Sequence, residues 1–241
     1  MEKDLPPKIS VIIPVYNGAE FISAALKNVL EQNIDALEII VVNDGSTDDT
    51  VSAISVLASE DSPYSIEYLE QTNKGPAAAR NLGLKVAQGE FVAFLDCDDV
   101  WSQNNLLKLS GVLHSESEVD VVLGKIQPQI YDKTCAKFKS NGSPTFSLSL
   151  VAMLARRSSF EKVGLFDESI WIGEDKDWFI RCVEKKVCIR YLSDHISQFY
   201  RRHDYNMTNN MNSSESYWLE LLRSSLRRRA LLKAGESTKN E

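Results

Sequence analysis

The stretch EFVAFLDCDDVW, residues 90–101, contains the pattern that decides the fold. Five apolar residues, 91–95, indicate a buried strand, and three carboxylates follow at Asp96, Asp98 and Asp99. A continuous apolar run is typical of a parallel strand that is covered on both faces. The charge at its end needs an explanation, because neighbouring carboxylates repel one another and burial raises that cost.

The sequence before this stretch alternates between apolar runs and segments with helical spacing. Strands are predicted at residues 9–15, 37–42, 66–69 and 91–95, and helices at 19–32, 48–58 and 76–87. This alternation predicts an α/β fold of the Rossmann-like type, with a mainly parallel sheet and helices on both faces. Ligands of such sheets bind beyond the carboxyl ends of the strands.

The pattern changes after residue 103. We expect helices at 104–114, 158–163, 174–186 and 214–233, strands within 119–130, 148–155 and 187–200, and a loop at 133–144. The sequence shows no internal repeat and no low-complexity linker. It therefore predicts a single domain followed by a C-terminal helical extension at residues 213–241.

The composition is typical of a soluble globular protein, with 43% hydrophobic and 25% charged residues. A formal net charge of −7 argues against a nucleic-acid partner. No apolar segment reaches the roughly 18 to 20 residues needed to span a bilayer, and the N-terminus has no apolar signal core. We therefore expect a cytoplasmic location. The four cysteines form no CxxC pair, which predicts reduced thiols and no zinc site.

Polar residues gather where the predicted strands end. They are Pro14, Val15, Tyr16 and Asn17 after the first strand, Asp44 and Gly45 after the second, and the acidic residues after the fourth. Because these ends share one edge of a parallel sheet, together they indicate a nucleotide pocket beside a hard-metal site. Taken alone, residues 43–48 are better explained as a turn and a helix cap, whereas Tyr16 is explained equally well as a packing aromatic.

Asp96 and Asp98 are the candidate metal ligands. In an extended chain their side chains point the same way, and a divalent cation would relieve their repulsion. Mg²⁺ and Mn²⁺ favour oxygen ligands, and Mg²⁺ commonly combines one or two carboxylates with substrate phosphates. The alternative is a solvated turn that ends the strand and caps the next helix, a role that we also assign to Asp99.

Three further positions carry cations or an imidazole. Lys74 lies at the start of a helix and Arg80 follows about one turn later, an arrangement that suits phosphate groups. The alternative for Arg80 is a surface cation paired with a nearby acid. His203, in YRRHDYNMT, is either a metal or phosphate ligand or a structural histidine.

Asp175 lies in the first turn of the helix GEDKDWFIRCVEKK. We expect its side chain to share the inward face with an apolar stripe consisting of Trp178, Phe179, Cys182 and Val183. A carboxylate that faces a cavity can act as a general base. The alternative is that Asp175 only complements the helix dipole.

These motifs resemble family 2 of the nucleotide-sugar glycosyltransferases, inverting enzymes with the GT-A fold. The matching pieces are ISVIIPVYNGAEFI, LEIIVVNDGSTDDT, NKGPAAARNLGL, GEFVAFLDCDDVW, FEKVGLFDE, GEDKDWFIR and YRRHDYNMT, in the family's order over roughly residues 8–210. The resemblance implies transfer from a nucleotide-diphosphate sugar, expected to be a UDP-sugar, to an acceptor hydroxyl. It also implies Mn²⁺ or Mg²⁺ as cofactor, and a carbohydrate or lipid-linked acceptor in polysaccharide or glycolipid biosynthesis.

The resemblance also implies roles for individual residues. Residues 1–102 would form the nucleotide-sugar-binding half and residues 103–212 the acceptor-binding half. The nucleotide would contact Pro14, Val15, Tyr16, Asn17, Asp44, Gly45, Lys74, Arg80 and Asp96. Asp98 would bind the metal, supported by Asp96 and His203, and Asp175 would be the catalytic base. The QxxRW motif of processive members is absent, which favours the addition of a single sugar.

Two other functions remain open from the sequence. FLDCDDV resembles the nucleophile motif of haloacid-dehalogenase-type phosphohydrolases, although that motif usually lies near the N-terminus. A non-catalytic sugar-nucleotide-binding protein would have the same fold. The C-terminal helix carries Tyr217, Trp218, Leu221, Leu222, Arg223, Arg227, Arg228 and Arg229. It is interpreted either as a packing or homodimer helix or as a peripheral contact with the inner face of the membrane.

Overall fold

A computed structural model describes residues 8–57, 66–204, 206, 207, 219, 221–228 and 230. The strands are β1 (Ile9–Val15), β2 (Leu37–Asn43), β3 (Ile66–Glu70), β4 (Phe91–Phe94), β5 (Val100–Trp101), β6 (Val121–Asp132), β7 (Lys137–Ser140), β8 (Met153–Arg156) and β9 (Ile189–Arg202). The helices with assigned bounds are α1 (Ile22–Leu30), α2 (Thr50–Leu57), α3 (Pro76–Val86), α4 (Asn105–Ser115), α5 (Arg157–Val163) and α6 (Glu174–Glu184). In this part of the chain all nine strands belong to one sheet, in the order β3-β2-β1-β4-β8-β6-β9-β5 with β7 beside β6.

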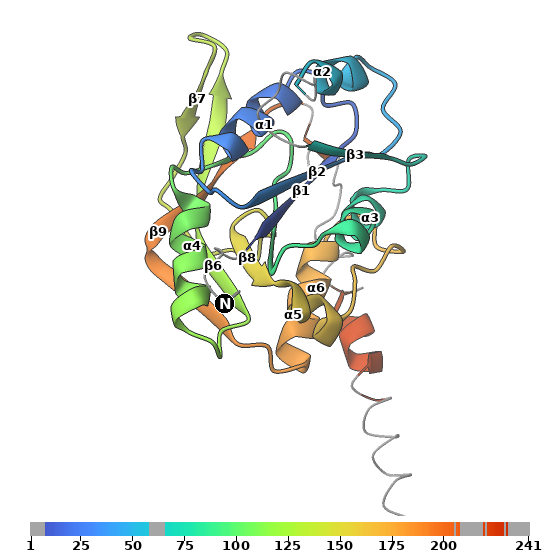
Figure 1. The fold of residues 1–241 in the computed structure, drawn as a ribbon, viewed down its shortest axis with the longest axis vertical. Coiled ribbons are helices and arrows are strands. Elements are labelled where there is room, and N and C mark those ends of the chain that lie inside the picture. Colours follow the sequence, from blue (N-terminus) through green and yellow to red (C-terminus); the bar gives the residue numbers. More distant parts are fainter. Residues whose placement is uncertain are drawn as a thin grey trace, which may run out of the picture.

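The sheet separates two apolar cores. In β1, Ile12 packs toward the face covered by α3, α5 and α6, whereas Val11 and Ile13 pack toward the face covered by α1, α2 and α4. This alternation explains why β1 is apolar throughout: both of its faces are buried. Figure 1 shows helices on either side of the sheet. The expected α/β fold, with a mainly parallel central sheet and helices on both faces, is confirmed.

Strand β9 pairs with two strands that precede it by many residues in the sequence, β5 and β6. It runs parallel to β6 and antiparallel to β5, where Trp101 lies opposite Gln198. Because β5 begins immediately after the acidic residues 96–99, its pairing with β9 places Gln198, Arg201, His203 and Asn206 beside that turn. This long-range pairing builds much of the candidate site.

Three local predictions differ from the structure. The expected loop at 133–144 contains β7, and the two-residue strand β5 was not predicted. The strand expected within 148–155 covers only residues 153–156. Strand β7 has mostly exposed side chains, so it carries no apolar run and is formed by its backbone pairing with β6.

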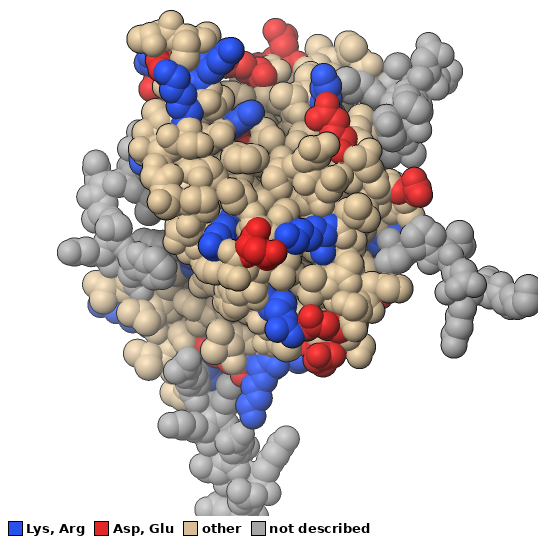
Figure 2. Space-filling model, turned by 90° about the vertical axis from the view of Figure 1, so that its left-hand side faces the viewer, with Lys and Arg blue, Asp and Glu red and all other residues tan. Residues whose placement is uncertain are grey.

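The hairpin β6–β7 carries much of the positive charge on one face of the molecule (Figure 2). Its exposed cations include Lys133, Lys137 and Lys139. Lys133 pairs with Asp204 and Lys139 pairs with Asp132, at 2.7 and 2.6 Å. The hairpin surface is therefore one of mixed charge.

The expected C-terminal helix is only partly described. Residues 219, 221–228 and 230 are helical, whereas Tyr217, Trp218 and the side chain of Arg229 lie outside the described residues. No helix in the ranges that the structure describes is both long and apolar enough to cross a membrane. All four cysteines are free thiols, as expected.

Candidate active site

The acidic residues after β4 lie in a turn, closed by a hydrogen bond from the Asp99 N–H to the Asp96 carbonyl at 3.0 Å. The extended geometry expected for Asp96 and Asp98 is therefore wrong, and their side chains have different partners. Asp98 Oδ2 lies 3.2 Å from His203 Nε2 and accepts a hydrogen bond from Asn206 Nδ2 at 3.0 Å. The acid turn, residues 96–99, thus meets the segment that follows β9.

Asp99 does not cap the next helix, contrary to expectation. It is buried and accepts hydrogen bonds from the Gln198 side chain and from the Arg201 N–H, the latter at 2.9 Å. Burial raises the pKa of Asp99 well above its ordinary value, and the charges of Asp98 and Asp96 raise it further. Its structural role is to fasten the acid turn to β9.

Arg80 lies inside the protein, between two carboxylates. Its guanidinium donates to Asp96 Oδ1 at 2.6 Å and to Glu174 Oε1. Burial lowers the pKa of Arg80, but the negative charges of Asp96 and Glu174 outweigh this effect and raise it. Arg80 is thus an interior bridge between the acid turn and the start of α6, and not the surface cation of the alternative interpretation. Glu174 was not predicted as a site residue, although it precedes Asp175 in the same motif.

Replacing Arg80 with methionine is expected to destabilise the fold by about 3–5 kcal/mol. The reason is that Glu174, which is equally buried, would keep its charge without a partner. Denaturant unfolding measures the change. The double variant Arg80→Met/Glu174→Gln is the matched control and should recover much of the loss. If Arg80→Met alone costs less than about 1 kcal/mol, the bridge does not support the fold in this way.

Asp44, at the end of β2, organises the loop before α3. Its Oδ1 accepts hydrogen bonds from Gln71 Nε2 at 2.7 Å and from the Lys74 N–H at 2.8 Å, and its Oδ2 accepts one from the Gly75 N–H at 2.9 Å. A carboxylate has about four lone-pair positions. One position on Oδ2 therefore remains for a ligand, while the side chain of Lys74 is exposed above the loop.

The ends of β1 and β2 are joined to one another. The Asn17 N–H donates to Ser46 Oγ at 2.9 Å, and Asn17 Oδ1 accepts from the Thr47 N–H at 2.8 Å. Asn17 and Gly45 both have positive φ, at 50° and 74°, which asparagine and glycine tolerate best. Next to this junction Tyr16 is 49% exposed, so its ring is available to a ligand. Pro14 is half-buried and Val15 is buried. They are the last two residues of β1, so their backbone positions the junction.

Asp175 is the second residue of α6, which follows Gly173 at its N-terminus. Its carboxylate is half-buried, with Oδ2 2.7 Å from Lys176 Nζ. Trp178 and Phe179 are buried as expected, but Val183 is 67% exposed, so the predicted apolar stripe is too wide at that end. Burial lowers the pKa of Arg80 and raises that of Asp96, and their mutual ion pair acts in the opposite direction on each. The negative charge of Asp175 adds a smaller effect that raises both pKa values. The acid turn and the start of α6 therefore form one electrostatic site.

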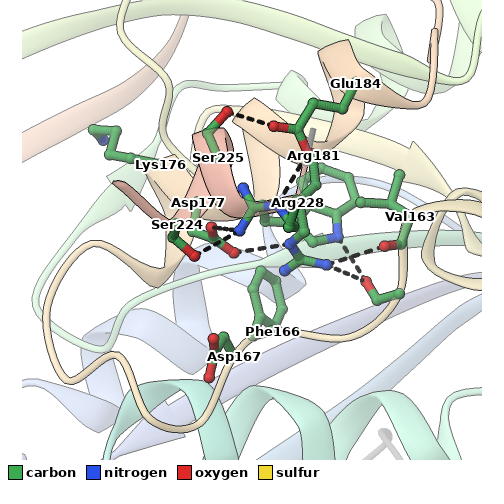
Figure 3. Close-up of polar contacts among 12 residues, drawn as sticks. Val163, Phe166, Asp167, Lys176, Asp177, Arg181, Glu184, Ser224, Ser225 and Arg228 are labelled. Carbon is green, nitrogen blue, oxygen red and sulfur yellow. Dashed lines mark hydrogen bonds and ion pairs between the residues drawn. The ribbon is translucent and has the colours of Figure 1, made fainter. Parts of the chain in front are cut away.

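The opposite side of α6 is held by the described C-terminal residues. Asp177 is 1% exposed; its Oδ2 accepts from Arg181 Nε at 2.8 Å and its Oδ1 from an Arg228 guanidinium N–H at 3.0 Å. Arg228 Nε also donates to Glu184 at 3.0 Å. Figure 3 shows both guanidinium groups pointing toward Asp177. Arg228 therefore packs the described C-terminal residues against α6.

We expect Arg228→Ala to lower stability by about 2 kcal/mol, since charged hydrogen bonds to Asp177 and Glu184 are lost. For a chain of this size that corresponds to a fall in Tm of roughly 4–8 °C. Differential scanning calorimetry measures it. Arg227→Ala removes an exposed arginine from the same helix and should change stability by less than about 0.5 kcal/mol. Equal effects of the two substitutions would contradict the assigned contact.

Within the described residues, no three His, Cys, Asp or Glu side chains form a complete metal site on their own. Asp98 and His203 nevertheless fit two positions of one. Ligands at right angles, each about 2.1 Å from a cation, are about 3 Å apart, close to the 3.2 Å seen between Oδ2 and Nε2. The His203 ring is held by stacking on Phe21, with centroids 4.7 Å apart. The carboxylate oxygen of Asp98 suits Mn²⁺ or Mg²⁺, with Asp96 nearby, and a substrate would supply further oxygens.

A family model described as glycosyl transferase family 2 matches residues 10–164, more than half of the chain. The chain belongs to this family. Its relatives include an uncharacterized glycosyltransferase of Nostoc sp. that is 33% identical, over 83% of this chain and 66% of that protein. An uncharacterized glycosyltransferase of Rickettsia conorii is 46% identical, over 70% of this chain and 29% of that protein. The chain thus spans only part of the length of these family 2 relatives.

Solved structures share the fold of this family 2 chain. The S. aureus protein TarS, residues 1–349 in complex with UDP-GlcNAc, matches with a TM-score of 0.73 and 24% identity, over 90% of this chain and 65% of that one. The mannosyltransferase PcManGT of Pyrobaculum calidifontis, in complex with GDP-Man and Mn²⁺, matches with a TM-score of 0.64 and 23% identity, over 80% of this chain and 57% of that one. At these identities the likeness establishes the fold alone.

Proposed function

We propose that this protein transfers one sugar from a nucleotide-diphosphate donor, a UDP-sugar, to a hydroxyl group of a carbohydrate or lipid-linked acceptor, with inversion. The observation that carries the proposal is the position of the acid turn. It lies at the carboxyl edge of the parallel strands, where Arg80 links Asp96 to the first residue of α6. Family membership and the donors bound by TarS and PcManGT support the same reaction class.

In this proposal residues 1–102 hold the donor and residues 103–212 receive the acceptor. Asp44 offers its remaining lone pair to the nucleobase, and the open ring of Tyr16 lies against the nucleoside. Asn17 and Gly45 shape that pocket, with Pro14 and Val15 behind it, while Lys74 and Arg80 supply positive charge on the phosphate side. Asp98 and His203, with Asp96 beside them, hold a divalent cation, which supplies positive charge to the diphosphate leaving group.

Asp175 is the general base of the proposed reaction. Its carboxylate accepts the proton of the acceptor hydroxyl as that oxygen forms a bond to the anomeric carbon. The bond between the anomeric carbon and the donor phosphate oxygen breaks on the opposite face, and the nucleoside diphosphate leaves. A single displacement of this kind inverts the configuration at the anomeric carbon. Lys176, 2.7 Å from Asp175, helps to fix the carboxylate in place.

A thermal-shift screen of nucleotide sugars with Mn²⁺ tests this function directly. We expect UDP-sugars to raise the Tm and the best of them to be hydrolysed slowly to UDP without an acceptor. Binding without hydrolysis or transfer over a broad acceptor panel would favour the non-catalytic binding protein. Turnover of phosphate monoesters without any sugar nucleotide would favour the phosphohydrolase.

We further propose a cytoplasmic location with a peripheral contact at the inner face of the membrane, where lipid-linked acceptors lie. The outer face of the described C-terminal residues supports it, because Leu222 and Leu226 are exposed beside the exposed Arg223 and Arg227. Flotation with anionic liposomes tests this contact. If Leu222→Ser/Leu226→Ser floats as well as the wild type, the contact is wrong and a homodimer or packing role for this face is favoured.

A further inference from the structure

Trp171 is unlike the other tryptophans that the structure describes. Trp101 and Trp178 are 1% and 0% exposed, whereas Trp171 is 53% exposed. An indole is a large apolar group, so leaving it half in water forgoes much of the free energy that its burial would contribute. Because tryptophan combines a large apolar ring with a polar N–H and is enriched at interfaces, Trp171 is a candidate binding surface.

The Trp171 ring lies flat against the backbone of Gly75. A Cβ atom built on Gly75 would be 3.0 Å from Cε3, 3.0 Å from Cζ3 and 3.4 Å from Cη2 of the indole. If this Cβ atom lay in the plane of the ring, 3.0 Å from Cε3 and Cζ3, it would be more than 4 Å from Cη2. Gly75 therefore lies over one face of the six-membered ring, while Trp171 as a whole is 53% exposed.

Gly75 is required for this arrangement. It has a φ of +87°, which side chains rarely tolerate, and any Cβ atom at this position would press on the indole. The Gly75 N–H also donates to Asp44 at 2.9 Å. The covered face of the ring is thus anchored to the loop that Asp44 organises.

Trp171 also adjoins the acids of α6. It precedes Gly173, the residue before α6, by two positions and Asp175 by four. Along the chain, Trp171 therefore joins the contact with Gly75 to the segment that carries the proposed base.

We propose that Trp171 is a stacking platform for the sugar ring of a substrate. One face of a pyranose presents C–H groups that are apolar and slightly positive, and these pack well on the negative face of an aromatic ring. This inference rests on the proposed glycosyl transfer. The sugar is either that of the donor or that of the acceptor, and both would use the same contact.

Isothermal titration calorimetry tests whether the sugar of the donor stacks on Trp171. UDP and UDP-GlcNAc, and likewise GDP and GDP-mannose, are titrated with Mn²⁺ into wild type, Trp171→Ala and Trp171→Phe. If the donor sugar stacks on Trp171, the alanine variant should bind the nucleotide sugar about tenfold more weakly while its affinity for the nucleotide alone is unchanged. Phenylalanine should restore most of the loss. Tyr191→Ala, which removes another exposed aromatic, should have no effect.

Methyl β-glycosides of glucose, galactose and N-acetylglucosamine test the acceptor arm. If the acceptor sugar stacks on Trp171, a methyl glycoside should change the tryptophan fluorescence of wild type and not of Trp171→Ala. The KM for that acceptor should then rise about tenfold in the alanine variant, with donor hydrolysis unchanged.

Two results would overturn the platform. One is an equal loss of affinity for nucleotide and nucleotide sugar together with a lower Tm, which would make Trp171 a packing residue for the Gly75 loop. The other is no change in either arm. If wild type binds no nucleotide sugar at all, the proposed function fails, whereas the fluorescence titration with methyl glycosides still decides whether the ring binds sugars.

Discussion

Asp175→Asn is expected to abolish most sugar transfer while leaving donor binding intact. Asparagine has nearly the shape of aspartate and can still accept the hydrogen bond from Lys176, but it cannot take a proton from an acceptor hydroxyl. A positioned general base contributes typically 10²- to 10⁴-fold, so a loss of this size in kcat is expected. The affinity for the nucleotide sugar should stay within about twofold, because the donor diphosphate is held elsewhere in the proposed site.

The measurement is the release of nucleoside diphosphate with acceptor present, beside the donor Kd for each variant. Asp194→Asn changes an exposed aspartate paired only loosely with Lys108 and serves as the matched control. If Asp175→Asn keeps most of its turnover, the base is a different group. Glu174 is a poor substitute, because it is buried and already paired with Arg80.

Chelation of divalent cations is expected to lower transfer at least 100-fold, and Mn²⁺ or Mg²⁺ should restore it. The leaving diphosphate carries several negative charges beside the acid turn, where the pKa values of both Asp96 and Asp99 are already raised, first by burial. A cation at Asp98 and His203 would remove that repulsion. Asp98→Asn should therefore need a much higher Mn²⁺ concentration for half-maximal activity.

Activity is titrated against Mn²⁺ after exhaustive dialysis with chelator. Asn206→Ala keeps both candidate ligand side chains but removes the donor to Asp98 and the acceptor of the His203 N–H, so it separates metal ligation from hydrogen bonding. Its Mn²⁺ requirement should change much less than that of Asp98→Asn. Full activity after chelation would contradict the metal site.

Most of the parallel part of the sheet was predictable because β1, β2 and β4 are largely buried on both faces. The continuous apolar runs of β1, β2 and β4 reflect this burial. Because parallel strands end at the same edge of a sheet, the polar residues that follow them were expected to lie together. Strands β5 and β7 were missed for the opposite reason. One is two residues long and the other is largely exposed, so their backbone pairing leaves no pattern in the side chains.

Within the site, the residue types were predictable but not their partners. The position of Arg80 on a helix followed from local spacing, whereas its contact with Glu174 joins residues 94 positions apart. The contact between Asp98 and Asn206 joins residues 108 positions apart. Local periodicity in the sequence cannot predict contacts between residues so far apart along the chain. The sequence therefore indicated that charge gathers at one edge of the sheet without showing which cation neutralises which acid.

The hydrogen bond between the Arg201 N–H and Asp99 also determines when the site can form during synthesis of the chain. Asp99 and the Arg201 N–H that holds it are separated by 102 positions, so the ribosome completes the turn long before its partner exists. Until residues 198–206 emerge, the clustered carboxylates lack the groups that fix them. Folding of this edge must wait for a long-range closure, which is intrinsically slow. The strands β1 to β4 can therefore pair on the nascent chain before β9 and the residues after it, which complete the proposed site, have been made.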